Sequence, residues 1–181
     1  MTYSSHIPWT PEVVNEELPG VGRMRAYESK IVIKAKSHRV WKVLSDVARW
    51  PQWLPTVTRV DALDGESIAV GARYWVQQPK LKPVVWTVTG LEDSRRFVWE
   101  ARFTGVRMIA EHAVVEKTQD VSEVSLRYFF DGLLGGVVGR IYRGIVTRYL
   151  AQEASALKQA VERLSSPDPS ESDRVSSCAE R

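Results

Sequence analysis

The sequence predicts an α+β domain in which a curved antiparallel sheet of about seven strands wraps a long C-terminal helix. Six consecutive runs have the residue pattern of strands and are joined by short turns, which favours an antiparallel meander. From Leu133 to Leu164, apolar residues then recur at helical spacing. An amphipathic helix of that length needs an equally long apolar partner, and the sheet is the only one that the chain offers.

Each element is predicted by a local signal. Residues 27–36 alternate like a strand, Ser37 is a suitable N-cap for a short helix, and Pro51 and Pro55 allow only a broken second helix or turn after it. The six further strands are expected at residues 56–63, 71–78, 82–91, 95–104, 106–117 and 122–131. In the final helix the charged residues fall largely between the apolar positions: Arg140, Arg143, Arg148, Glu153 and Lys158.

Length and composition indicate one domain with extensions. The chain has 181 residues, of which 44% are hydrophobic and 26% charged, so it can bury a core without disulfides. We expect an irregular lead-in over residues 1–25, the folded domain over residues 26–164 and a disordered tail over residues 165–181, because the tail is rich in Ser, Pro and acidic residues. The single cysteine, Cys178, lies in that tail and excludes an internal disulfide.

Several classes of function are disfavoured. The net charge of +3 is spread along the chain without a basic run, which argues against a nucleic-acid partner. No apolar run is long enough to span a bilayer, and Met1–Gly20 does not read as a secretory signal, so we expect a cytoplasmic protein. The three histidines are scattered and no phosphate-binding loop is present, so we expect neither a metal nor a cofactor.

A sheet that curves around one helix leaves space between them, which is a natural ligand site. Trp75, Trp86 and Trp99 recur on the strands and could line that space or simply fill the core. The more apolar face of each strand should point to the helix, and this places His112 and Tyr128 inward as the notable polar groups. His112 is a candidate for acid–base work and Tyr128 a candidate donor to a ligand oxygen. The alternative for His112 is a buried, hydrogen-bonded structural residue.

Specific residues resemble a known family. The segments are residues 33–46 (IKAKSHRVWKVLSD) and residues 49–55 (RWPQWLP), followed by a Trp-rich meander and the terminal helix. They resemble the START-like superfamily with its helix-grip fold, and within it the polyketide cyclase/dehydrase and lipid-transport (SRPBCC) family. The resemblance covers roughly residues 26–164. It implies a cavity whose mouth would lie near Trp50, Trp53, Leu54, Leu133 and Val137.

The resemblance implies binding of a hydrophobic or amphipathic small molecule, lipid or polyketide-like, by a carrier or sensor. It leaves open a polyketide cyclase, aromatase or dehydratase that uses His112 and Tyr128, and also a protein-interaction module, which a large exposed apolar patch would indicate. The oligomeric state is not determined by the sequence. The ligand-binding residues that we expect are Trp50, Trp53, Tyr74, Trp86, Trp99, Met108, Leu133, Val137, Ile141 and Ile145.

Overall fold

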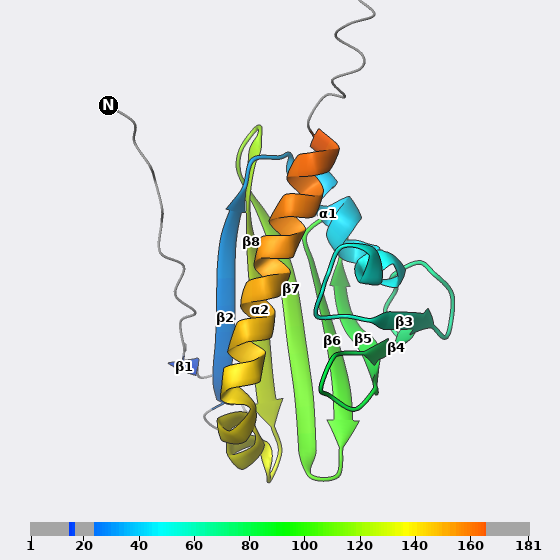
Figure 1. The fold of residues 1–181 in the computed structure, drawn as a ribbon, viewed down its shortest axis with the longest axis vertical. Coiled ribbons are helices and arrows are strands. Elements are labelled where there is room, and N and C mark those ends of the chain that lie inside the picture. Colours follow the sequence, from blue (N-terminus) through cyan, green and yellow to red (C-terminus); the bar gives the residue numbers. More distant parts are fainter. Residues whose placement is uncertain (1–14, 17–23, 166–181) are drawn as a thin grey trace, which may run out of the picture.

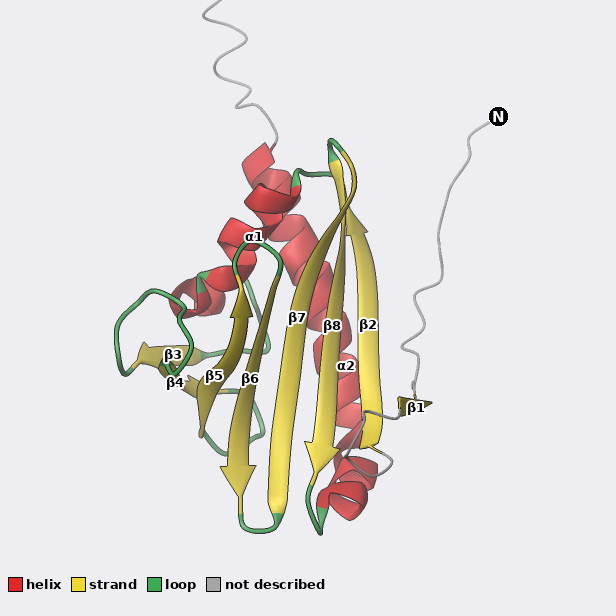
Figure 2. Cartoon of the chain, turned by 180° about the vertical axis from the view of Figure 1, so that it is seen from behind, coloured by secondary structure: helices red, strands yellow, loops and turns green. Residues whose placement is uncertain are grey.

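The structure is a computed structural model that describes residues 15–16 and 24–165. Over those residues it forms one antiparallel sheet of eight strands in the order β1-β2-β8-β7-β6-β5-β4-β3. The long helix α2 runs along one face of the sheet, above β2 and β8, and the other face is free of helices (Figures 1 and 2). The elements are β1 (Asn15–Glu16), β2 (Met24–Ile33), α1 (Ser37–Ser45), the 3-10 helix η1 (Val47–Gln52), β3 (Arg59–Ala62), β4 (Arg73–Gln77), β5 (Val84–Glu92), β6 (Arg96–Phe103), β7 (Val106–Thr118), β8 (Val121–Asp131) and α2 (Gly135–Ser165).

The two short helices, α1 and η1, lie beside α2 on the same face of the sheet (Figure 1). Val40, Trp41 and Leu44 form the apolar stripe of α1 and are all buried. In η1, Trp50 is buried and donates its indole N–H to the carbonyl of Leu44 at 3.0 Å. That bond ties η1 to the end of α1, and the Trp41 ring meets Phe97 on β6 edge to face.

Glycines bring the start of α2 close to the sheet. A Cβ at Gly135 would lie 3.0 Å from the carbonyl carbon of Phe130, and one at Gly139 would lie 3.1 Å from its ring. Tyr27 on β2 donates its hydroxyl proton to the Gly139 carbonyl at 2.7 Å. Further along, α2 buries one apolar residue per turn against the sheet: Leu150, Ala154, Leu157 and Val161. The glycines at the start of α2 therefore allow the helix to pack closely on β8.

The predicted architecture is confirmed. All six strands of the meander exist, and their inward faces are those that alternation predicts, including the buried set Met108, Ala110, His112 and Val114 on β7. Strand β4, which alternation left ambiguous, buries Tyr74 and Val76.

Three details differ from the predictions. Ser37 is the first residue of α1 and not its cap; Lys36 holds the cap position, and the Ser37 hydroxyl instead donates to Glu116 at 2.8 Å. A short strand, β1, lies within the stretch expected to be irregular, and it pairs with the first residues of β2. Phe103 continues the inward-facing series of β6 but is exposed, and it is the last residue of that strand. Of the expected lead-in and tail, residues 1–14, 17–23 and 166–181 lie outside the described residues, as does Cys178.

The outer face of the sheet carries a ladder of charges that includes a buried carboxylate. Glu28 on β2 accepts hydrogen bonds from Arg127 at 2.9 Å and from Ser125 at 2.8 Å, both on β8. Burial raises the pKa of Glu28, but these two bonds and the charges of Arg127 and Lys30 outweigh it and hold the pKa below its ordinary value. The carboxylate thus stays ionised and joins β2 to β8. Among the described helices, none has the length and apolar character needed to cross a membrane.

Candidate functional site

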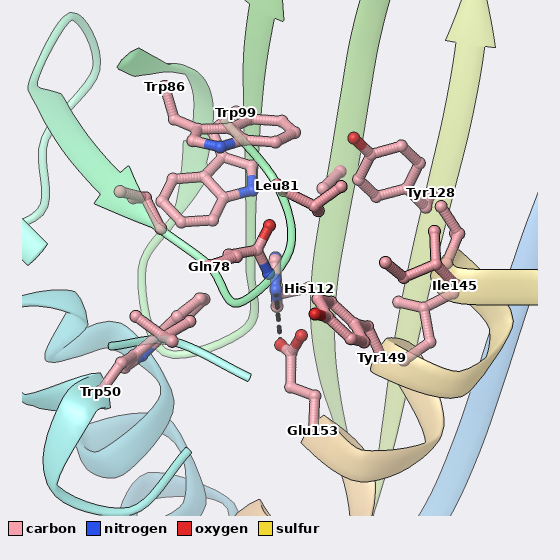
Figure 3. A pocket seen from close by; sticks show the side chains of 15 residues that line it. Trp50, Gln78, Leu81, Trp86, Trp99, His112, Tyr128, Ile145, Tyr149 and Glu153 are labelled. Carbon is pink, nitrogen blue, oxygen red and sulfur yellow. Dashed lines mark hydrogen bonds and ion pairs between the residues drawn. The ribbon is translucent and has the colours of Figure 1, made fainter. Parts of the chain in front are cut away.

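A pocket lies between α2 and the sheet, where the space was expected (Figure 3). Its walls come from α2, from strands β4 to β8, from η1 and the segment that follows it, and from the loop between β4 and β5. The lining residues are Trp50, Val57, Val76, Gln78, Leu81, Trp86, Trp99, Ala110, His112, Tyr128, Ile145, Val146, Tyr149, Leu150 and Glu153. The free volume is about 70 Å³, which is room for a few water molecules and not for an extended acyl chain.

A histidine–carboxylate pair spans the pocket. Nε2 of His112 on β7 lies 2.9 Å from Oε1 of Glu153 on α2, and the two side chains are only 4% and 12% exposed. Because a carboxylate can only accept, the imidazole carries a proton on Nε2 and donates it. Nδ1 of His112 is buried and has no hydrogen-bond partner among the described residues. Glu153 therefore fixes both the orientation and the tautomer of the ring.

Aromatic rings surround this pair. The His112 ring stacks on Phe97 with 4.4 Å between centroids and an interplanar angle of 7°. Trp50 and Trp99 lie 5.4 Å and 5.7 Å from the same ring. Trp99 in turn stacks on Trp86 at 5.1 Å. We call this group of rings around the His112–Glu153 pair the aromatic box. Flat aromatic surfaces of this kind suit planar ligands.

Two tyrosines border the pocket on the side away from Trp50. Tyr128 on β8 donates its hydroxyl proton to the sulfur of Met108 at 3.0 Å, which is a weak acceptor. Burial raises the pKa of Tyr128 well above its usual value, so the phenol remains a donor. Tyr149 on α2 donates to the carbonyl of Pro79, in the loop that joins β4 and β5. That bond fastens the loop to the helix at the edge of the pocket.

Several residues expected at the site from the sequence do line the pocket: Trp50, Trp86, Trp99, His112, Tyr128 and Ile145. Tyr74 and Met108 are buried immediately behind it, Tyr74 beside Trp99 and Met108 under Tyr128. The hydroxyl of Tyr74 has no partner in the described structure, and burial together with the charge of Asp46 raises its pKa.

The remaining expected residues lie elsewhere. Trp53 faces a separate surface groove between η1 and α2. Leu133, Val137 and Ile141 line a shallow depression at the start of α2. Val137 precedes Glu153 by sixteen residues, which is about 24 Å along a helix. The expected mouth residues therefore do not surround one opening.

Sequence reasoning missed the other polar members of the site. Glu153 was expected on the polar face of the final helix, yet it points into the pocket. A signal existed: Glu153 follows Tyr149 by four positions and precedes Leu157 by four, so it continues a stripe on one helix face. Gln78 and Leu81 come from a loop, whose course no periodicity predicts. In the described residues, no three side chains of the metal-binding types gather closely enough to hold an ion.

The comparison with protein families agrees with this geometry. The family model described as polyketide cyclase / dehydrase and lipid transport matches residues 24–162. The chain belongs to this family. Its fold is the helix-grip fold, in which the long helix lies across the antiparallel sheet. No curated protein sequence matches this member of the family.

Solved structures share the fold at low sequence identity. The Zhui aromatase/cyclase from Streptomyces sp. R1128 is 20% identical with a TM-score of 0.62, over 78% of this chain and 95% of that one. A norcoclaurine synthase point mutant from Thalictrum flavum, solved with a transition-state analogue, is 16% identical with a TM-score of 0.65, over 79% and 97%. A START superfamily protein from Mycobacterium smegmatis is 18% identical with a TM-score of 0.59, over 77% and 98%.

Proposed function

We propose that this member of the polyketide cyclase/dehydrase and lipid-transport family binds a small aromatic molecule that carries a hydrogen-bond donor. The observation that supports this most directly is the aromatic box around the His112–Glu153 pair. A free volume of about 70 Å³ is too small for a lipid chain, and the lining side chains have to shift to admit even a single ring. The chain would act as a carrier or sensor of that molecule.

The donor on the ligand follows from the carboxylate. Oε1 of Glu153 is engaged by His112, whereas Oε2 has no hydrogen-bond partner among residues 24–165. Oε2 is not fully buried, so a ligand hydroxyl in the pocket can donate to it. A ligand with a carboxylate at that place would instead meet a like charge.

Three molecules of nearly equal shape test the proposal: p-cresol, p-xylene and p-toluate. Calorimetric titration should show p-cresol binding about tenfold more tightly than p-xylene, as one hydrogen bond to a charged group provides. p-Toluate should bind more weakly than either. In Glu153→Leu the preference for p-cresol over p-xylene should disappear, and Gln159→Leu, on the solvent side of the same helix, should keep it. Equal affinities for p-cresol and p-xylene, or tighter binding of palmitate, would reject the proposal.

A second candidate function is acid–base catalysis at the same pair. Its support is the fixed tautomer: Glu153 holds the proton on Nε2, which leaves Nδ1 of neutral His112 as a base. The test is solvent deuterium exchange at the carbon beside the carbonyl of 4-hydroxyphenylacetone, followed by NMR. Catalysis predicts exchange above the buffer rate, with a loss of about a hundredfold in His112→Phe. If p-cresol binds but no such exchange occurs, the catalytic function is rejected and the carrier or sensor function is retained.

A further inference from the structure

The end of the molecule where α2 begins exposes a group of large apolar side chains. We call this group the apolar tip; it consists of Phe103, Leu133, Leu134, Val137 and Ile141. Leu133 is 97% exposed and Ile141 is 72% exposed, although each belongs to a residue type that is normally buried. The first turn of α2 and the turn between β6 and β7 lie together at the lower end of the molecule in Figure 1.

The apolar tip is held in a fixed arrangement. The backbone N–H of Leu134 donates to the carbonyl of Gly105, in the β6–β7 turn, at 3.0 Å. A Cβ at Gly105 would lie 3.2 Å from the Leu134 side chain, so the leucine packs directly on that turn. Gly135 donates back to the Gly132 carbonyl at 3.0 Å and starts the helix. The β6–β7 turn, the β8–α2 turn and the start of α2, which carry or adjoin the exposed side chains, are therefore fastened to one another.

The unpaired charges on α2 beside the apolar tip are positive. Residues 133–152 include Arg140, Arg143 and Arg148 and no acidic residue. None of the three arginines forms an ion pair with any residue that the structure describes. The nearby acidic groups Glu100 and Asp131 are already engaged by Arg102 and Arg107. The surface thus offers apolar side chains next to unneutralised positive charge.

We propose that the apolar tip docks on the surface of a bilayer that contains anionic lipid. Apolar side chains that enter the interfacial region gain the free energy of leaving water, and arginines beside them are attracted to anionic headgroups. Each attraction alone gives weak membrane binding, and the two together give stable attachment. Arg140 lines the same shallow depression as Val137 and Ile141, so both kinds of contact are made at one place.

A second copy of the chain fits this surface less well. A two-fold contact through the apolar tip would bring the arginines of both copies together, and like charges oppose each other. An acidic protein would satisfy the charge but would need a hollow to receive Leu133, which projects from a turn. A bilayer adapts to a projecting side chain. Docking there would also place the pocket near the membrane, since Ile145 in its wall is one helical turn beyond Ile141.

The test is flotation of the full chain with vesicles of phosphatidylcholine alone and of phosphatidylcholine mixed with phosphatidylglycerol in equal parts. The chain should float with the mixed vesicles and not with the neutral ones, and added salt should weaken binding. Val137→Asp should lower the partition coefficient about tenfold or more. Val70→Asp is the matched control, because Val70 is 64% exposed and Val137 is 61% exposed. It should bind like the unmodified chain.

A second pair of variants separates local charge from net charge. Arg140→Gln with Arg143→Gln should lower binding to the mixed vesicles, whereas Arg39→Gln with Arg95→Gln, which are also exposed but lie far from the apolar tip, should not. No binding to mixed vesicles, or equal losses in the members of either pair, would overturn the proposal. So would a dimer in sedimentation that Val137→Asp dissociates. The affinity for p-cresol should be unchanged in Val137→Asp. Vesicle binding and ligand binding are therefore tested separately, and either proposal can be rejected without the other.

Discussion

The imidazole of His112 and the carboxylate of Glu153 meet at 2.9 Å inside the domain although they are 41 positions apart in the chain. One belongs to a strand in the middle of the sheet and the other to the helix that lies across it. The bond crosses the pocket and joins the two layers through their side chains. Its removal should therefore affect both stability and binding.

Replacement of Glu153 by Leu should lower the free energy of unfolding by about 1–3 kcal/mol, because it leaves both ring nitrogens of His112 unpaired in a buried site. Glu153→Gln keeps an oxygen that can accept from Nε2, so its loss should be smaller. Urea denaturation of the two variants and of the unmodified chain measures both losses in the free energy of unfolding. If the Leu variant is as stable as the unmodified chain, the cost of desolvating the carboxylate cancels the hydrogen bond.

The bond from Tyr149 to the carbonyl of Pro79 should slow entry to the pocket. Tyr149→Phe removes it and frees the β4–β5 loop, so the association rate of p-cresol should rise about fivefold, as expected for the loss of about 1 kcal/mol. Stopped-flow measurement of tryptophan fluorescence follows the rate, since Trp86 and Trp99 line the same pocket. Tyr142→Phe, on an exposed side chain of α2, is the control. Equal rates in the two variants would show that the loop does not limit entry.

The fold was predictable because periodicity reports burial directly. Strands that cover a core on one side alternate, and a helix that lies on a sheet keeps a stripe, so His112 could be placed inward from β7 alone. Pairings among neighbouring strands then followed from short turns. The boundaries of elements were less predictable: Ser37 has the chemistry of a cap, but Glu116 from β7 takes its hydroxyl, a tertiary contact that no local pattern contains.

The site was only partly predictable because it joins distant segments. Trp50, Trp99 and His112 could be proposed from residue type and face, and the structure brings them together. Val137 and Glu153 show the limit: both lie on the final helix, yet Val137 is exposed near its start while Glu153 reaches the pocket. Periodicity gives the face of a helix that is buried but not which length of it the sheet covers.

Acid should weaken the domain through Glu28. The pKa of this carboxyl is lower in the folded chain than its ordinary value. Its contribution to stability is therefore complete above the unfolded-state pKa and is lost as the pH falls through the folded-state pKa. Glu28→Gln should cost about 1.5–3 kcal/mol near neutral pH, and the difference from the unmodified chain should shrink in acid.

Urea denaturation at a series of pH values measures this difference. Glu66→Gln is the control, because Glu66 is exposed and makes no hydrogen bond or ion pair within the described part of the chain. A constant difference between Glu28→Gln and the unmodified chain from neutral to acid pH would show that the carboxylate charge contributes nothing. Loss of stability in Glu66→Gln as well would assign the effect to net charge.

Gly132 should tolerate substitution less well than another glycine of the same backbone conformation. Its φ is +94°, and a Cβ there would lie 2.7 Å from the carbonyl oxygen of Gly105. Gly71 has φ of +90° and nothing within 4 Å of the corresponding position. Alanine at Gly71 should cost about 1–2 kcal/mol, which is the strain of the left-handed backbone alone.

Alanine at Gly132 adds a backbone clash to the same strain, so it should lower the free energy of unfolding by more than alanine at Gly71 does. The excess measures how firmly the β8–α2 turn is pressed on the β6–β7 turn, the contact that also holds Leu134 in place. If vesicle binding falls in Gly132→Ala while Gly71→Ala retains it, the fixed geometry of the apolar tip contributes to docking. Equal stabilities of the two alanine variants would show instead that the two turns separate readily, because the clash could then be relieved without loss of packing.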